Sequence, residues 1–147
     1  MEVRLDIHNL DSWVCNFFSN KEQQTTATVI CLSGEVGAGK TTFTQSIARC
    51  LGVGEPITSP TFLIQKEYDI NNHAWIQKLI HIDAYRLNNK EELEYLGWNK
   101  IIHNPHTCII VEWPEMVSGI SFPDNTTFIS LTINDDYSRT LHIKKQP

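Results

Sequence analysis

A short loop carries the residue types in this sequence that are best suited to chemistry on phosphate groups. Gly34, Gly39, Lys40 and Thr41 fit the pattern G-x-x-x-x-G-K-[ST], within the stretch CLSGEVGAGKTTFTQ at residues 31–45. Glycines let the backbone turn so that successive N–H groups point at phosphate oxygens. The lysine would reach the outer phosphates as a point charge, and the Thr41 hydroxyl is placed to bind Mg²⁺. The loop therefore predicts a site for a nucleoside triphosphate and its metal.

Two acidic residues stand at the ends of predicted buried strands. Asp83 ends the run LIHID, and Glu112 ends the run CIIVE. Ligands of α/β sheets bind at the carboxyl ends of strands, and phosphoryl transfer needs a carboxylate that holds the metal. We expect at least one of the two to do so. The residues alone do not separate a metal-binding role from a water-orienting role.

Two further side chains are candidates because of their position. Thr61, in the segment TSPTF, follows the phosphate-loop helix and offers a hydroxyl that could sense the nucleotide. Trp113 directly follows Glu112, and its spacing is compatible both with a cover over the nucleotide and with a place in the core. The stretch NNKEE at residues 88–92 has Glu where the guanine-reading signature has Asp, so adenine is the expected base.

The elements that must position these residues follow from apolar periodicity. Asp11 is the expected N-cap of the first helix. The prediction is α/β: a single P-loop NTPase domain over residues 1–147, with a central mixed sheet flanked by helices. Strands are expected at residues 2–8, 27–33, 62–68, 75–83, 107–113, 126–133 and 139–145, and helices after residue 11 and at 41–51 and 90–97.

Composition limits the classes of function. The chain has 147 residues and a formal net charge of −5, which argues against an autonomous nucleic-acid binder. No run of 18 apolar residues is present, so we expect no membrane span. The four cysteines lie far apart without a Cys-x-x-Cys pair. We expect all four to be buried free thiols in a reducing cytoplasm; they are Cys15, Cys31, Cys50 and Cys108.

The segments GEVGAGKTTF, TSPTF, HIDAYR, EELEYLGW and VEWPE resemble, in order and spacing, those of the TsaE (YjeE) family. These are small P-loop ATPases needed in bacteria for threonylcarbamoyladenosine modification of tRNA. The resemblance covers about residues 10–144. Two places depart from the family pattern. The loop reads Gly-Glu-Val-Gly where Gly-Asp-Leu-Gly is usual, and the N-terminal strand and helix match only in pattern, so the resemblance leaves a nucleotide contact from residues 8–11 open.

The resemblance implies roles for particular residues. Thr41 would bind Mg²⁺, with Glu112 as the acidic ligand, directly or through water. Asp83 would serve the γ-phosphate side, as a water-orienting group or a further metal partner. Thr61 would be a switch-like threonine, and Trp113 and Arg139 would lie beside the nucleotide. ATP or ADP would be held by the loop residues Gly34, Glu35, Val36, Gly37, Ala38, Gly39, Lys40, Thr41 and Thr42.

The resemblance also implies partners. These would be TsaD, which transfers the threonylcarbamoyl group, and TsaB. ATP hydrolysis, slow in the isolated chain, would drive a conformational cycle in that complex, and tRNA would be contacted only indirectly. Two other functions remain open from the residues: a small-molecule kinase, although only four arginines are available, and a nucleotide-dependent binding module without catalysis.

Overall fold

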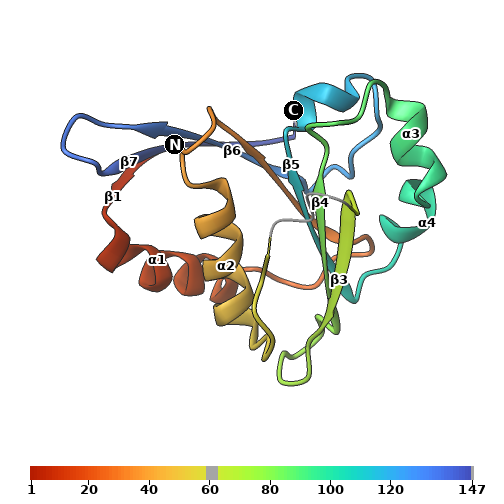
Figure 1. Ribbon diagram of the computed structural model, residues 1–147. Helices are drawn as coiled ribbons and strands as arrows, with labels where there is room; N and C mark the ends of the chain where they lie inside the picture. The colour runs from red at the N-terminus through yellow and green to blue at the C-terminus, as the bar shows by residue number, and fades with distance from the viewer. Residues whose placement is uncertain (59–62, 147) are drawn as a thin grey trace.

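The centre of the fold is one mixed sheet, covered by helices on both faces (Figure 1). The computed structural model describes residues 1–58 and 63–146, and within these ranges the sheet has seven strands in the order β1-β7-β6-β2-β5-β4-β3. Their bounds are β1 Glu2–Leu5, β2 Thr28–Ser33, β3 Gln65–Asp69, β4 Lys78–Asp83, β5 Thr107–Glu112, β6 Thr127–Ile133 and β7 Arg139–Lys145. The predicted fold class, an α/β domain with a mixed sheet flanked by helices, is confirmed.

The middle of the sheet is parallel and its margins are antiparallel. β2 pairs in parallel with both β5 and β6, and β5 pairs in parallel with β4. The apolar runs of β2 and β5 are buried on both faces, as their sequences predict. Since parallel strands end at the same edge of a sheet, the carboxyl ends of β4, β5 and β2 meet there.

Two helical layers enclose the sheet (Figure 1). Helices α1 and α2 cover one face, where Val14 and Phe43 pack with Ile110 of β5. The opposite face is covered by α3, α4 and the 3-10 helix η1, where Trp98 packs with Ile109. The sequence did not predict α4 or η1, which are only one turn long. The helices are α1 Ile7–Ser19, α2 Lys40–Leu51, α3 Lys90–Tyr95, α4 Trp98–Ile101 and η1 Pro114–Val117.

The start of α1 differs from the prediction. β1 ends at Leu5, and the Asp6 carboxylate accepts hydrogen bonds from the backbone N–H groups of His8 and Asn9. Asp6 is therefore the N-cap, and the prediction that Asp11 caps this helix is wrong. Asp11 lies within α1 and binds Arg49 of α2 instead.

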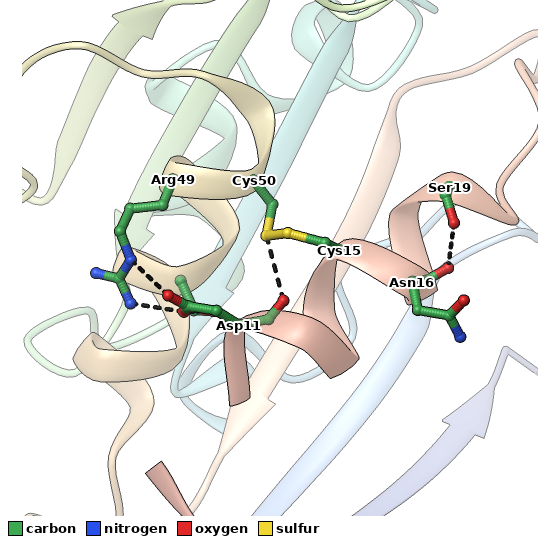
Figure 2. The surroundings of a disulfide bond; sticks show 7 residues. Asp11, Cys15, Asn16, Ser19, Arg49 and Cys50 are labelled. Carbon is green, nitrogen blue, oxygen red and sulfur yellow. Dashed lines mark hydrogen bonds and ion pairs between the residues drawn. A yellow bond between two sulfur atoms is a disulfide. The ribbon is translucent and has the colours of Figure 1, made fainter. Parts of the chain in front are cut away.

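The cysteines form two classes. Cys31 and Cys108 are buried free thiols, as expected. Cys15 of α1 and Cys50 of α2 form a disulfide, with Cα atoms 5.3 Å apart (Figure 2). The prediction of four free thiols is wrong for this pair, because the packing of α1 on α2 brings together residues that neither helix's own pattern relates. The expectation of a reducing compartment rested on four free thiols, and only Cys31 and Cys108 are free.

Candidate functional site

The glycine-rich loop joins the carboxyl end of β2 to the start of α2. Gly39 is the N-cap of α2 and has a φ of 104°, a left-handed conformation that suits glycine. Gly34 has a φ of 149°, and a Cβ atom there would lie 2.8 Å from the carbonyl oxygen of Leu131 in β6. The loop thus lies directly against β6, and its turn requires glycine at both positions.

We expect Gly34→Ala to lower the free energy of unfolding by about 1–3 kcal/mol, because backbone atoms must move to admit the methyl group. A matched control is Gly54→Ala, where an added Cβ meets nothing within 4 Å. Urea denaturation of both variants measures the difference. If the two variants lost the same stability, the close approach of the loop to β6 would be contradicted.

Lys40 is held inside the loop. It is 6% exposed, and its Nζ donates hydrogen bonds to the carbonyl oxygens of Gly34 at 2.5 Å and Glu35 at 3.0 Å. The same Nζ lies 4.2 Å from the centroid of the Trp113 ring. Burial lowers the pKa of the Lys40 ammonium, and the nearby carboxylate of Glu112 opposes that shift. The cation therefore lies between the loop carbonyls and the acidic strand ends.

The two predicted carboxylates are neighbours at the sheet edge. Asp83 of β4 and Glu112 of β5 are register partners, so their side chains leave the sheet on the same face. Asp83 is half-buried, and its Oδ1 accepts from the N–H of Tyr85 at 3.0 Å. Glu112 is buried, and its Oε1 lies 3.1 Å from Nε2 of His81.

These groups line one pocket of about 320 Å³. Its walls come from the loop, the start of α2, the ends of β4 and β5, and the start of β7. The lining residues are Val36, Gly37, Gly39, Lys40, Thr41, Thr42, Asp83, Glu112, Trp113 and Arg139. Of the other predicted residues, Gly34, Glu35 and Ala38 contribute backbone to the loop. Thr61 lies outside the described residues.

Arg139 connects this pocket to a second hollow. Its Nε donates to the carbonyl oxygen of Ala38 at 2.8 Å, which holds the guanidinium against the loop. The second hollow measures about 230 Å³ and shares Gly39, Thr42 and Arg139 with the first. Apart from Asp6, its other lining residues are apolar or aromatic. They are Leu5, Ile7, Leu10, Phe43, Leu131, Tyr137 and Leu141.

Trp113 has an unusual backbone. Its φ is 59°, a left-handed value that is rare for a non-glycine residue. The side chain is half-buried, packs against the core on the α3 side and against the Tyr85 ring at 5.0 Å, and also lines the pocket. The interpretation as a core residue is therefore met in part, and a cover over the nucleotide stays a prediction.

The donor set fits Mg²⁺. The Thr41 hydroxyl and the carboxylates of Asp83 and Glu112 place hard oxygen atoms, the donor type that Mg²⁺ prefers, around one pocket. In the part of the chain that the structure describes, no group of three or more His, Cys, Asp or Glu side chains could hold a metal. Mg²⁺ commonly binds through one or two carboxylates and completes its shell with phosphates and water.

Three residues near the site were not singled out from the sequence: His81, Thr44 and Tyr85. A signal was present for the first two. His81 precedes Asp83 by two positions in a predicted strand, so both side chains share a face. Thr44 follows Lys40 by four positions in a predicted helix, which also places them together.

A buried parallel strand, a glycine-rich loop with Lys40 and Thr41, and the helix that follows define a P-loop NTPase domain. The chain belongs to the TsaE family: the family's sequence model, described as "Threonylcarbamoyl adenosine biosynthesis protein TsaE", matches residues 11–141.

Relatives support the assignment. The chain is similar to the tRNA threonylcarbamoyladenosine biosynthesis protein TsaE of Treponema pallidum, with 36% identity over 78% of this chain and 80% of the relative. It is 34% identical to the Haemophilus influenzae protein of that name, over 75% of this chain and 66% of the relative. The match to the Bacillus subtilis protein of that name has 40% identity over 60% of this chain and 52% of the relative. The chain thus covers less than two thirds of the length of the last two.

A solved structure gives the same fold. The crystal structure of Bacillus subtilis YdiB superposes with a TM-score of 0.72 at 26% sequence identity, over 100% of this chain and 86% of that one.

Proposed function

We propose that this chain binds ATP with Mg²⁺ and hydrolyses it slowly, as the ATPase subunit of threonylcarbamoyladenosine modification of tRNA. The observation that carries the proposal is the meeting of Lys40, Thr41, Asp83 and Glu112 in one pocket at the carboxyl ends of parallel strands. Relatives at 34–40% identity are named for biosynthesis of this modification.

Each residue has a distinct task in this proposal. The Lys40 ammonium exchanges the neutral carbonyls of Gly34 and Glu35 for phosphate oxygens, which are stronger acceptors. Backbone N–H groups at the start of α2 bind phosphate with the favourable end of the helix dipole. Thr41 and Glu112 hold Mg²⁺, which neutralises charge on the phosphate oxygens. Asp83, half-buried at the rim, orients the attacking water.

The base has a place as well. The apolar hollow adjoins the phosphate pocket through Gly39 and Thr42, and Arg139 borders both. We therefore propose that adenine lies in this hollow, packed against Leu10 and Leu131, while Trp113 covers the phosphate end.

The partners in the proposal are TsaB and TsaD, with tRNA contacted only through them, in the cytoplasm. Binding of tRNA needs a positively charged surface. This chain has a net charge of −5, so in the proposal a partner supplies that surface. Among the helices of residues 1–58 and 63–146, none is long and apolar enough to cross a membrane.

A kinase is the weaker candidate. Kinases of this class bring several arginines to the transferred phosphoryl group. Arg139 is the arginine that lines the phosphate pocket, whereas Arg4 and Arg49 form ion pairs with Asp136 and Asp11 elsewhere. A phosphorylated acceptor in a substrate screen would favour the kinase.

The experiment that tests the proposal is ATP hydrolysis by the purified chain with Mg²⁺, alone and with the TsaB–TsaD pair. We expect slow turnover that rises when the pair is added. Unchanged turnover would contradict partner gating, and reconstituted tRNA modification would then decide between a pure nucleotide switch and a different role.

Lys40→Ala should weaken ADP binding by about 10–150-fold, because a charge-assisted contact worth about 1.5–3 kcal/mol is lost. Isothermal titration with ADP measures the change. Lys100→Ala removes an exposed lysine from α4 and should leave the affinity unaltered. Equal affinities of wild type and Lys40→Ala would contradict the phosphate-loop assignment.

A further inference from the structure

A fully buried histidine lies beneath the phosphate pocket and contacts its acidic residue. His81 of β4 is 0% exposed, and its Nε2 lies 3.1 Å from Oε1 of Glu112. Its other ring nitrogen, Nδ1, is also buried and has no hydrogen-bond partner within the described residues. Buried polar atoms nearly always have a hydrogen-bond partner. The single polar contact of the His81 ring, to the Glu112 carboxylate, therefore indicates a role for that contact.

The sheet places this histidine one layer below the pocket. His81 and Asp83 are two positions apart on β4 and share a face, and Asp83 is the register partner of Glu112. Asp83 and Glu112 line the pocket, whereas His81 does not. The imidazole therefore supports Glu112 from the protein side and has no direct access to a ligand.

Thr44 of α2 also approaches Glu112 but is the weaker support. Its hydroxyl lies 3.0 Å from the carbonyl oxygen of Lys40 and 3.4 Å from Oε1 of Glu112. A hydroxyl has a single proton to donate. The shorter contact takes that proton, so the hydrogen bond that fixes Oε1 comes from His81.

We propose that His81 is a positioning residue: its Nε2–H donates to Oε1 of Glu112 and fixes that carboxylate, so that Oε2 is presented to the metal of the bound nucleotide. This inference rests on the proposed function. It also assigns the tautomer. A proton on Nδ1 would leave a buried N–H without an acceptor and turn a nitrogen lone pair toward the carboxylate, and both are costly.

The test measures metal affinity in the nucleotide complex. His81→Phe keeps a ring of similar shape but removes the donor. We expect Mn²⁺, followed by its electron paramagnetic resonance signal with saturating ADP, to bind about 10–100-fold more weakly, the usual effect of losing a group that orients a metal ligand. ADP affinity in the presence of EDTA should stay within about twofold, because His81 does not touch the nucleotide pocket.

A conservative variant separates positioning from packing. The amide N–H of His81→Gln can donate to Glu112, so this variant should recover most of the Mn²⁺ affinity. An unchanged Mn²⁺ affinity in folded His81→Phe, or equal losses with and without metal, would overturn the positioning role. Failure of the wild type to bind ADP even in EDTA would overturn the proposed function itself.

The tautomer of His81 can be measured in the unaltered protein, which does not depend on the folding of His81→Phe. Nitrogen-15 chemical shifts of the His81 ring distinguish the two neutral tautomers. We expect the proton on Nε2, with slow exchange against solvent. A proton on Nδ1 would overturn the assignment, whatever the variants show.

Discussion

Glu112→Gln is expected to reduce Mg²⁺-dependent ATP hydrolysis by about 10²–10³-fold, the range seen when one electrostatic stabiliser of a transition state is removed. The amide has nearly the same shape as the carboxylate, but it lacks the charge that, in the proposed function, holds the cation. ADP affinity in EDTA should stay level or rise, since a negative charge near the phosphates is lost. Hydrolysis assays and ADP titration in EDTA measure the two effects.

Glu115→Gln is the matched control for Glu112→Gln. Burial lowers the pKa of Lys40 and both carboxylates oppose that shift, so both act on the same cation. Glu115 is exposed, however, and its Oε2 accepts a hydrogen bond from Ser33 at 3.3 Å. Glu115→Gln should therefore change the rate of ATP hydrolysis little. Equal losses of hydrolysis and metal-free binding in Glu112→Gln would indicate that Glu112 only supports the fold.

The sequence predicted the parts of the site that depend on local patterns. The continuous apolar runs of β2 and β5 indicate strands buried on both faces, and such strands must end where a parallel sheet binds its ligands. The meeting of Asp83 and Glu112 follows from that geometry. The loop motif fixes Lys40 at the start of α2 for the same reason, because the turn and the helix are adjacent in the chain.

Contacts between distant elements were beyond the sequence. The order β6-β2-β5 places β6 beside the glycine loop, and no periodicity reports this order. The contact of His81 with Glu112 spans 31 positions and depends on the pairing of β4 with β5. The alternation of β4 places His81 and Asp83 on one face. The hydrogen bond to Glu112 depends on the register between β4 and β5, which the alternation does not give.

The first helix shows the limit of capping rules. Asp6 and Asp11 are both acceptable N-caps by residue type. The strand was expected to continue to His8, and that expectation excluded Asp6. The helix instead begins at Ile7, and this earlier start turns Asp11 toward α2, where it accepts hydrogen bonds from Arg49 and Ser46.

The Cys15–Cys50 disulfide joins α1 to the phosphate-loop helix α2, beside the Asp11–Arg49 ion pair (Figure 2). We expect the double variant Cys15→Ser/Cys50→Ser to lose about 4 kcal/mol in free energy of unfolding, from the chain entropy of the loop that the bond closes. The ion pair is more than half exposed and contributes at most about 1 kcal/mol. Urea denaturation of wild type and double variant measures the loss.

Reductant provides the control. With reductant, the wild type should have the same free energy of unfolding as the double variant. The free energy of unfolding of the double variant should not change with reductant. Native alkylation tests the bond directly, because burial raises the pKa of Cys108 to about 12 and that of Cys31 well above its usual range. Neither buried thiol should react, so any native labelling reports on Cys15 and Cys50. Rapid labelling of both in protein isolated without oxidation would show that the chain normally holds a dithiol, and α1 would then be anchored to α2 by packing and the Asp11 contacts alone.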